Sequence, residues 1–560
     1  MNETAVPGGV DEAGLDLDAL RQRGRLAPRL KLEPLMARWP LWPHLLAPAP
    51  YAFNLAFRLI PLLESFLQRP KAHAAACKDP ALFGGPFVAL AESALDEVSR
   101  YLAQLRRQHA ALLRFAEDFK SFDKALQQQA DGYALDQLYA DLPASLSGLV
   151  ELLYDLHNHP TMRLFEDLLY ASPLDISDAQ SVCLHLQDDD QRPFFLSTPL
   201  LDAPDRLFIH RRFDDPLLAE VLATRWRPGL PESLLSLIAQ SSVPRATLRQ
   251  MFITEALQRQ QPDYRGDGLR MRYFGHACVL IQSRDTAVLI DPVTAWQRQG
   301  EDATLCFDDL PDHIDYVLIS HAHQDHLVAE TLLQLRERIG TVVVPANDRG
   351  NLADPSLRLM LQQLGFRSIR SMEPFERLPI AGGEIVSLPF VGEHGGLDIA
   401  SKHSLLLRCQ GRSILFMVDS DAVDPRLTER LVERIGPVDI LFVGMECCGA
   451  PVSWLYGPLL PEALSRRNDQ SRRFSGSNCE RAWAALQALG SRQVFVYAMG
   501  QEPWMKHLMG LAYEPDSPQL LEIREFLRRC EAAGISARSL KGCYEEVFAA
   551  AAPEPGERRP

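Results

Sequence analysis

The amino-acid sequence predicts an α/β protein of two domains: a mainly helical α+β N-terminal domain over residues 1–265 and an α/β sandwich over residues 266–550. The first observation is the length of 560 residues, which exceeds what one hydrophobic core ordinarily serves. The second is the helical spacing of apolar residues through much of the first half. The third is a change after Gly268, where short apolar runs alternate with helical segments.

In the N-terminal half, apolar residues recur at helical spacing over residues 95–115 and 135–156, and helical character returns over residues 216–258. Short alternating runs at residues 181–186 and 206–209 predict strands between them. The turn-rich segment 261–268 predicts the linker between the domains. About the first ten residues and the tail 551–560 are expected to be disordered.

The C-terminal half alternates predicted strands with predicted helices. Helices fit at residues 327–338, 426–435 and 479–489. Strands are predicted at residues 269–274, 277–282, 287–290, 315–320, 340–344, 384–388, 404–409, 413–418, 439–443 and 493–498. This alternation is typical of a sandwich in which helices cover the sheets.

Composition excludes several functional classes. The formal net charge of −15 disfavours a nucleic-acid-binding protein, which needs a basic face. No signal-peptide pattern begins the chain, and no run of about 18 apolar residues predicts a membrane span. The ten cysteines form no CxxC pair, which disfavours a disulfide framework or a zinc ribbon. We therefore expect a cytoplasmic protein with no nucleic-acid or membrane partner.

The most informative motif is a cluster of metal-ligand residues at the end of a predicted buried strand. His321 and His323 alternate along an extended segment, so their side chains can reach one ion. Asp325 and His326 follow where the chain turns into a helix, and they can reach a second ion. Imidazole and carboxylate ligands suit zinc, manganese or iron. The motif predicts a two-metal site.

This HxHxDH string resembles the metal motif of the metallo-β-lactamase superfamily. The resemblance extends to Gly275-His276-Ala277, to the Asp291-Pro292 turn, and to the strand that ends at Asp419. It implies an αββα sandwich for the C-terminal domain. It also implies that Asp419 binds both ions through its carboxylate.

One ligand position departs from the pattern of hydrolases in that superfamily, which place a histidine between these motifs. Here the corresponding segment contains Glu393 and His394, and both remain candidates for the position. A glutamate would make the ligand set more anionic and would suit iron. The family's last histidine is also absent from its usual place, so His507 and Glu502 remain weak candidates.

With its large N-terminal domain and the Gly-Glu-His-Gly segment, the chain resembles the di-iron β-hydroxylases of nonribosomal-peptide pathways, a group that includes the enzyme of chloramphenicol biosynthesis. The resemblance implies two iron ions, O2 as co-substrate and an external electron donor. It implies an amino acid tethered to a peptidyl carrier protein as substrate, and a homodimer formed through the N-terminal domain. The iron ligands it implies are His321, His323, Asp325, His326, Glu393 and Asp419. The alternative is a dinuclear zinc hydrolase, such as a lactonase, thioesterase or phosphodiesterase.

Each of three further features in the C-terminal half of the sequence has two possible interpretations. The segment from Glu446 to Gly449 lines the pocket or packs as buried thiols, and Trp454, Tyr456 and Trp504 shape the pocket or fill the core. The basic residues 466–473 meet a carrier protein or form a solvated loop. Asp188, Asp189 and Asp190 are most simply a polar turn.

Overall fold

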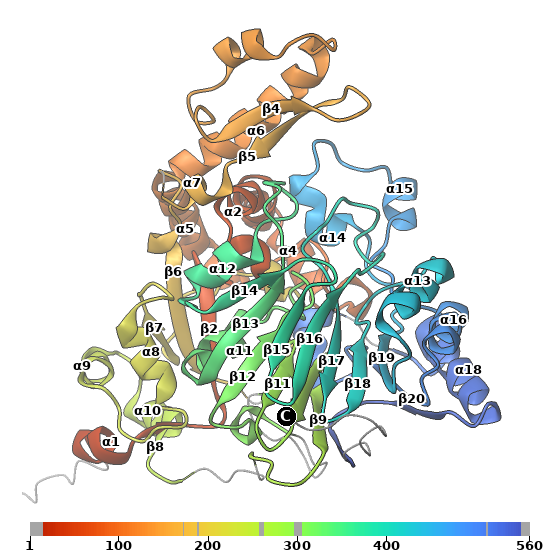
Figure 1. Cartoon of the computed structure of the whole chain (residues 1–560). Helices are drawn as coiled ribbons and strands as arrows, with labels where there is room; N and C mark the ends of the chain where they lie inside the picture. Colours follow the sequence, from red (N-terminus) through yellow and green to blue (C-terminus); the bar gives the residue numbers. More distant parts are fainter. Residues whose placement is uncertain are drawn as a thin grey trace, which may run out of the picture.

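The computed structural model describes residues 15–171, 173–187, 190–256, 262–295, 305–510 and 513–549. The expected disorder of the first ten residues and of the tail 551–560 falls outside this part of the chain. In Figure 1 two sheets stand side by side in the centre, helices cover the right-hand sheet, and the N-terminal half packs on the left and projects above.

The first sheet has seven strands in the order β14-β13-β12-β11-β10-β9-β22. Strands β11 to β14 run parallel, whereas β9 pairs antiparallel with both β10 and β22. The strands are β9 (Leu269–Gly275), β10 (Cys278–Gln282), β11 (Ala287–Ile290), β12 (Ile314–Leu318), β13 (Ile339–Pro345), β14 (Ile369–Met372) and β22 (Tyr544–Phe548).

The second sheet also has seven strands, in the order β15-β16-β17-β18-β19-β20-β21. One buried cluster that includes Val279, Leu407 and Phe442 fills the space between the two sheets. The strands are β15 (Arg377–Ile380), β16 (Gly383–Leu388), β17 (Ser404–Cys409), β18 (Arg412–Phe416), β19 (Ile440–Gly444), β20 (Gln493–Tyr497) and β21 (Ser536–Ser539). The covering helices are α13 (Pro425–Ile435), α16 (Cys479–Leu489) and α18 (Pro518–Ala532). This is the predicted αββα sandwich.

The strand predictions in this half agree with the structure to within about two residues at each end. Four strands were not predicted: β14, β15, β21 and β22. All four lie at or next to a sheet edge, where their side chains are only partly buried and the hydrophobic pattern is weak.

The N-terminal half combines helices with a small antiparallel sheet in the order β3-β2-β6-β7. This combination agrees with the α+β fold predicted for this half. Its strands are β1 (Arg25–Leu26), β2 (Leu30–Met36), β3 (Trp39–Pro40), β4 (Val150–Tyr154), β5 (Pro160–Leu164), β6 (Gln180–Leu186), β7 (Arg206–Ile209) and β8 (Phe252–Ile253). Its longer helices are α1 (Leu17–Arg23), α2 (Pro48–Asn54), α3 (Ile60–Gln68), α4 (Pro70–Ala76), α5 (Leu95–Gln108), α6 (Ala110–Gln129), α8 (Pro216–Ala223), α9 (Glu232–Gln240) and α10 (Arg245–Met251).

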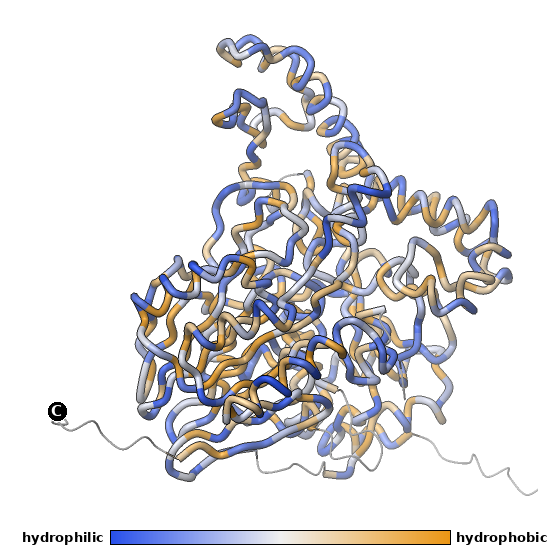
Figure 2. The backbone as a smooth tube through the Cα atoms, turned by 90° about the vertical axis from the view of Figure 1, so that its right-hand side faces the viewer, coloured by the Kyte–Doolittle hydropathy of each residue, from blue (hydrophilic) through white to orange (hydrophobic). Residues whose placement is uncertain are grey.

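The helix predicted over residues 135–156 is wrong. This segment holds a short 3-10 turn at Asp136–Asp141 and then strand β4, which pairs with β5 as a hairpin. Val150 and Leu152 are buried and alternate with more exposed residues, so the period of two decides the local structure. Figure 2 shows mixed hydropathy in the projection that carries this hairpin and longer orange runs in the layered strands below it.

The two halves share one hydrophobic core. Helix α11 (Ala329–Leu335) covers the outer face of the first sheet, and one cluster joins its residues to those of β2, α2 and α8. All ten cysteines are free thiols. Within the described residues, no helix has the length and hydrophobicity that a membrane span requires.

Candidate metal centre

The predicted ligands meet where the strands of both sheets end. His321 follows β12, Asp419 follows β18, and Glu393 lies in the loop after β16. The side chains of His321, His323, Asp325, His326 and Glu393 are buried, and Asp419 is 9% exposed. Strand ends of a rigid sandwich thus bring residues nearly a hundred positions apart into one cluster.

One group of ligand atoms comes from His321, His323 and Glu393, and these atoms all lie within 4.8 Å of one another. The Nδ1 atom of His323 lies 2.7 Å from Oε1 of Glu393, and Nε2 of His321 lies 3.8 Å from Oε2. Burial alone would raise the pKa of the Glu393 carboxyl, but His323 and His394 lower that pKa to about 2. The group therefore offers two imidazoles and one carboxylate to a cation.

The loop that presents Glu393 has an unusual backbone. Glu393 has φ of 68°, in the left-handed region that non-glycine residues seldom adopt. The preceding Gly392 has φ of 88°, and a Cβ added there would lie 2.1 Å from the side chain of Asp421. Glycine suits position 392, because a larger residue would be strained at this φ and would displace the side chain of Asp421.

A second group comes from His321, His326 and Asp419. The Nε2 atom of His326 lies 3.0 Å from Oδ2 of Asp419 and 3.5 Å from Oδ2 of Asp325. Its other nitrogen, Nδ1, lies 3.0 Å from Oδ2 of Asp291 and donates to it. Nε2 faces two carboxylates, Asp325 and Asp419, which raise the pKa of His326 well above its ordinary value against the effect of burial. A metal ion on Nε2 would take the place of that proton between the imidazole and the carboxylates.

His276 also lies within reach of Asp325 and His326, but its hydrogen bonds assign it a different role. Its Nδ1 accepts from the backbone N–H of Gly500 at 3.1 Å, so the proton sits on Nε2. That Nε2–H donates to Oδ2 of Asp325 at 3.1 Å. His276 therefore orients the aspartate rather than offering a lone pair to a metal.

Asp291 fixes the two flanking imidazoles. It is fully buried and accepts from Ser320 through the backbone N–H at 2.7 Å and the hydroxyl at 2.6 Å. Because that hydroxyl proton goes to Asp291, the Ser320 oxygen accepts from Nδ1 of His321 at 2.9 Å. Both His321 and His326 are thereby held with Nε2 as the free acceptor.

The substitution Asp291→Asn is expected to weaken metal binding by about 10- to 100-fold, the usual effect of removing a group that orients a metal-bound histidine. Chelator competition measures this affinity. Asp424→Asn is the matched control, because Asp424 is an exposed cap of α13 and no metal ligand. Equal affinities for both variants would contradict the orienting role.

Comparison with known proteins shows where this chain belongs. Residues 25–256 match the family described as the diiron non-heme beta-hydroxylase N-terminal domain, and residues 286–496 match the beta-lactamase superfamily domain. The chain is 35% identical, over 92% of its length and 98% of the relative's, to the 4-amino-L-phenylalanyl-CmlP-peptidyl-carrier-protein 3-hydroxylase of Streptomyces venezuelae. The chain belongs to the diiron non-heme β-hydroxylases.

The solved structures agree with this assignment. The crystal structure of CmlA, a diiron β-hydroxylase from Streptomyces venezuelae, superposes with a TM-score of 0.87, covering 94% of this chain and all of that one. A mutant of CmlA gives a TM-score of 0.85 with the same coverage. The present diiron β-hydroxylase is accordingly a monooxygenase, and its cofactor is a pair of iron ions.

The side chains of this diiron β-hydroxylase fit such a pair. Nε2 of His321, Nε2 of His323 and Oδ1 of Asp419 are buried without a hydrogen-bond partner among the described residues. Unsatisfied buried polar atoms are costly, and here they gather at one point. Histidine nitrogens with three carboxylates form a donor set suited to iron.

The other three candidate residues, His394, His507 and Glu502, lie at different distances from the cluster of candidate ligands. His394 is adjacent, with Nδ1 3.0 Å from Oε2 of Glu393, but it belongs to neither group of ligand atoms. The structure does not bring His507 or Glu502 to the cluster. His507 lies 3.6 Å from Asp190, and Glu502 accepts from the Tyr273 hydroxyl at 2.7 Å. Both side chains therefore interact with residues outside the cluster. The sequence carried no signal for Asp190 or Tyr273 as their partners.

A small cavity of about 70 Å³ opens beside the cluster of this β-hydroxylase. Its walls include Glu446, Gly449, Trp454 and Phe474, so the pocket-lining interpretation holds for the Glu446 segment and for Trp454. Burial raises the pKa of Glu446 to about 7. Tyr456 packs on Phe474 with ring centroids 5.8 Å apart.

The N-terminal domain supports this cavity. Its buried His44 packs edge-on against Tyr456, with ring centroids 5.1 Å apart. Sequence reasoning missed His44, His276 and Asp291 as parts of the site. A lone buried histidine in another domain carries no sequence signal, whereas the motifs around His276 and Asp291 were visible without their roles.

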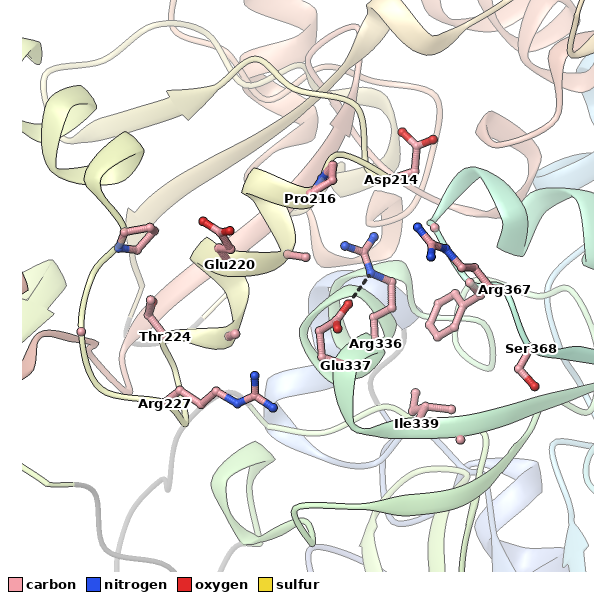
Figure 3. A pocket seen from close by; sticks show the side chains of 17 residues that line it. Asp214, Pro216, Glu220, Thr224, Arg227, Arg336, Glu337, Ile339, Arg367 and Ser368 are labelled. Carbon is pink, nitrogen blue, oxygen red and sulfur yellow. Dashed lines mark ion pairs between the residues drawn. The ribbon is translucent and has the colours of Figure 1, made fainter.

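A larger cavity of about 730 Å³ lies elsewhere, between α8 and the segment that joins α11 to β13 (Figure 3). Arg227, Arg336 and Arg367 line it together with the carboxylates of Glu220 and Glu337. None of the candidate metal ligands lies in its walls. It is separate from the metal centre of the β-hydroxylase.

Proposed function

We propose that this chain hydroxylates the β-carbon of an amino acid held as a thioester on a peptidyl carrier protein of a nonribosomal peptide synthetase. One atom of O2 enters the C–H bond as a hydroxyl group, and the other leaves as water with two protons and two electrons from an external donor. The observation that carries the proposal is Glu393, a carboxylate beside His321 and His323 in a metallo-β-lactamase-type site. The S. venezuelae relative, by its name, acts on such a carrier-bound amino acid.

In this proposal His321, His323 and Glu393 would hold one iron, while Asp325 and His326 would hold the other. Asp419 would contribute to both: its Oδ2 lies 3.0 Å from His326, and its Oδ1 has no hydrogen-bond partner in the described structure. The irons, when bound, supply the reduction of O2 and the oxidation of a C–H bond.

The protein's own contribution is position and the exclusion of water. The buried ligands cannot rotate freely, because Asp291 and Ser320 hold His321 and His326 while His276 holds Asp325. Trp454 and Phe474 line the small cavity with apolar surface. A dry site protects a reactive intermediate from side reactions with solvent.

Two measurements test this function together. Elemental analysis is expected to find about two irons per chain, as the six-ligand set requires. Incubation with a reductant, O2 and an aminoacyl-loaded carrier protein is expected to add one oxygen atom to the amino acid, as mass spectrometry would show. Two zincs without iron, together with hydrolysis of the thioester alone, would falsify the proposal in favour of a zinc hydrolase.

The proposal includes an electron-transfer partner, residence in the cytoplasm and a homodimer formed through the N-terminal domain over residues 1–265. Exposed hydrophobic side chains in the projection support the dimer: Tyr133, Tyr139, Leu156, Phe165 and Leu168, with Leu156 fully exposed. Sedimentation of the purified chain checks this, and a monomer at micromolar concentration would contradict it.

A further inference from the structure

A second cavity, of about 380 Å³, lies at the boundary between the two domains. Its volume falls within the range of about 300–1,000 Å³ typical of small-molecule sites. Both halves of the chain line it: the walls include Arg58, Leu62, Phe194 and Phe195 from the N-terminal half, and Trp454 and His507 from the C-terminal half. The walls are mainly aromatic and aliphatic with a few polar groups.

This interdomain cavity is next to the metal cavity. Trp454 lines both of them. Pro451 and Leu508 line the interdomain cavity, and the residues bonded to them, Ala450 and Met509, line the metal cavity. The indole Nε1–H of Trp454 donates to the backbone oxygen of Gly84 at 2.9 Å, so the shared wall is attached to the N-terminal domain.

Arg58 is a cation in this wall without a carboxylate partner among the described residues. Its Nη2 donates to the backbone oxygens of Ser453 at 3.2 Å and of Trp454 at 2.7 Å. Burial lowers the pKa of the guanidinium to about 10, which leaves it charged at neutral pH. By contrast, Arg336 in the cavity of Figure 3 pairs with Glu337. An uncompensated, largely dehydrated cation in a cavity wall indicates a ligand that brings acceptor oxygens.

His507 supplies a complementary group from the other domain. Its Nε2 faces Asp190 at 3.6 Å, and its buried Nδ1 has no hydrogen-bond partner in the described parts of the chain. Burial lowers the pKa of His507 to about 3, so the ring is neutral. With the proton on the nitrogen that faces the carboxylate, Nδ1 can accept an N–H or O–H from a ligand.

We propose that this interdomain cavity binds the phosphopantetheine arm of the carrier protein, an inference that rests on the proposed function. The arm alternates amide groups with apolar segments and ends in a phosphate, so it needs donors, acceptors and apolar walls in one passage. Arg58 donates to its phosphate or amide oxygens, His507 accepts from an amide N–H, and Trp454, which lines both cavities, lies where the aminoacyl end passes to the metal cavity. At about 70 Å³ the metal cavity is too small to admit an aminoacyl arm by itself.

The first test uses the iron-loaded full chain with Arg58→Met. The KM for the loaded carrier is expected to rise about tenfold or more, the loss of one charged hydrogen bond, with kcat nearly unchanged. Arg58→Lys keeps the charge, and its KM for the loaded carrier is expected to lie between that of the unaltered chain and that of Arg58→Met. Arg227→Met, in the cavity of Figure 3, is the matched control and is expected to keep the original KM. Iron content and thermal midpoint, measured for each variant, identify any that misfold.

A second variant tests the cavity independently of Arg58. Two small probes then show which group of the arm Arg58 contacts. Leu62→Trp fills the cavity and is expected to raise the KM for the loaded carrier about tenfold or more, while iron content is kept. Phosphopantetheine and pantetheine are then compared as competitors: if Arg58 meets the phosphate, Arg58→Met weakens only the first, and if it meets an amide oxygen, both weaken equally. Unchanged KM and unchanged competition in Arg58→Met and Leu62→Trp would overturn the arm site. Failure of the unaltered chain to hydroxylate any loaded carrier would instead overturn the proposed function.

Discussion

Replacing Glu393 by glutamine is expected to abolish hydroxylation and to lower iron content. The amide removes the negative charge between His321 and His323, and it leaves one ion with two neutral ligands from that group. The loss in kcat/KM should exceed the roughly 10- to 100-fold typical of a residue that only orients a ligand. Iron analysis and mass spectrometry of the carrier-bound product measure the two effects.

Two further variants show which property of Glu393 matters. Glu393→His restores the ligand type of zinc hydrolases, so it should retain two metal ions, favour zinc and still fail to hydroxylate. Glu384→Gln, in a half-buried ion pair of the same domain, is the control and should keep full activity. Normal hydroxylation by Glu393→Ala, with a loss of activity in His394→Ala, would move the ligand role to His394.

The substitution Lys31→Met is expected to destabilise the protein by about 3–5 kcal/mol, because it leaves buried carboxylates with one fewer cation. The Lys31 ammonium lies 2.7 Å from Asp190, and both side chains are almost completely buried. It also lies 3.7 Å from Glu330 of α11, so the ion group joins the two domains. Urea unfolding followed by tryptophan fluorescence measures the change in the free energy of unfolding.

Arg21→Met provides the comparison for Lys31→Met. Arg21 pairs with Asp18 and Glu232 on the surface, where solvent and salt screen the ion pairs, so its loss is expected to change the stability little. A loss of stability in Lys31→Met no larger than in this control would show that Arg192, which also contacts Asp190, compensates the carboxylates alone.

The two-sheet fold was predictable because the inner strands carry a local hydrophobic pattern, whereas the four partly buried edge strands do not. The four ligand-type residues from His321 to His326 were predictable for the same reason, since they lie within six positions of one another. The orientation of the side chains at the site could not be predicted. The lone pair of His326 depends on Asp291, and the proton of His276 depends on the backbone of Gly500, more than two hundred residues away. Hydrogen-bond partners of this kind are set by the tertiary structure.

The aspartate run at 188–190 illustrates the same limit. Three consecutive aspartates are typical of a solvated turn, and Asp188 and Asp189 lie outside the described residues. Asp190, however, is completely buried, because Lys31 and Arg192 approach it. Lys31 is 159 positions away and appears in the sequence as an ordinary strand residue, so no local pattern could pair the two.

The position of β22 affects how the metal domain forms during synthesis. Strand β22, near the end of the chain, pairs with β9, the first strand of that domain, and completes its sheet. About 270 residues separate the two, so at about 5–20 residues per second the edge of β9 stays unpaired for roughly 15 to 50 seconds. An open edge strand is a template for pairing with other chains. Chaperone capture of the nascent chain should therefore peak between emergence of β9 and release from the ribosome.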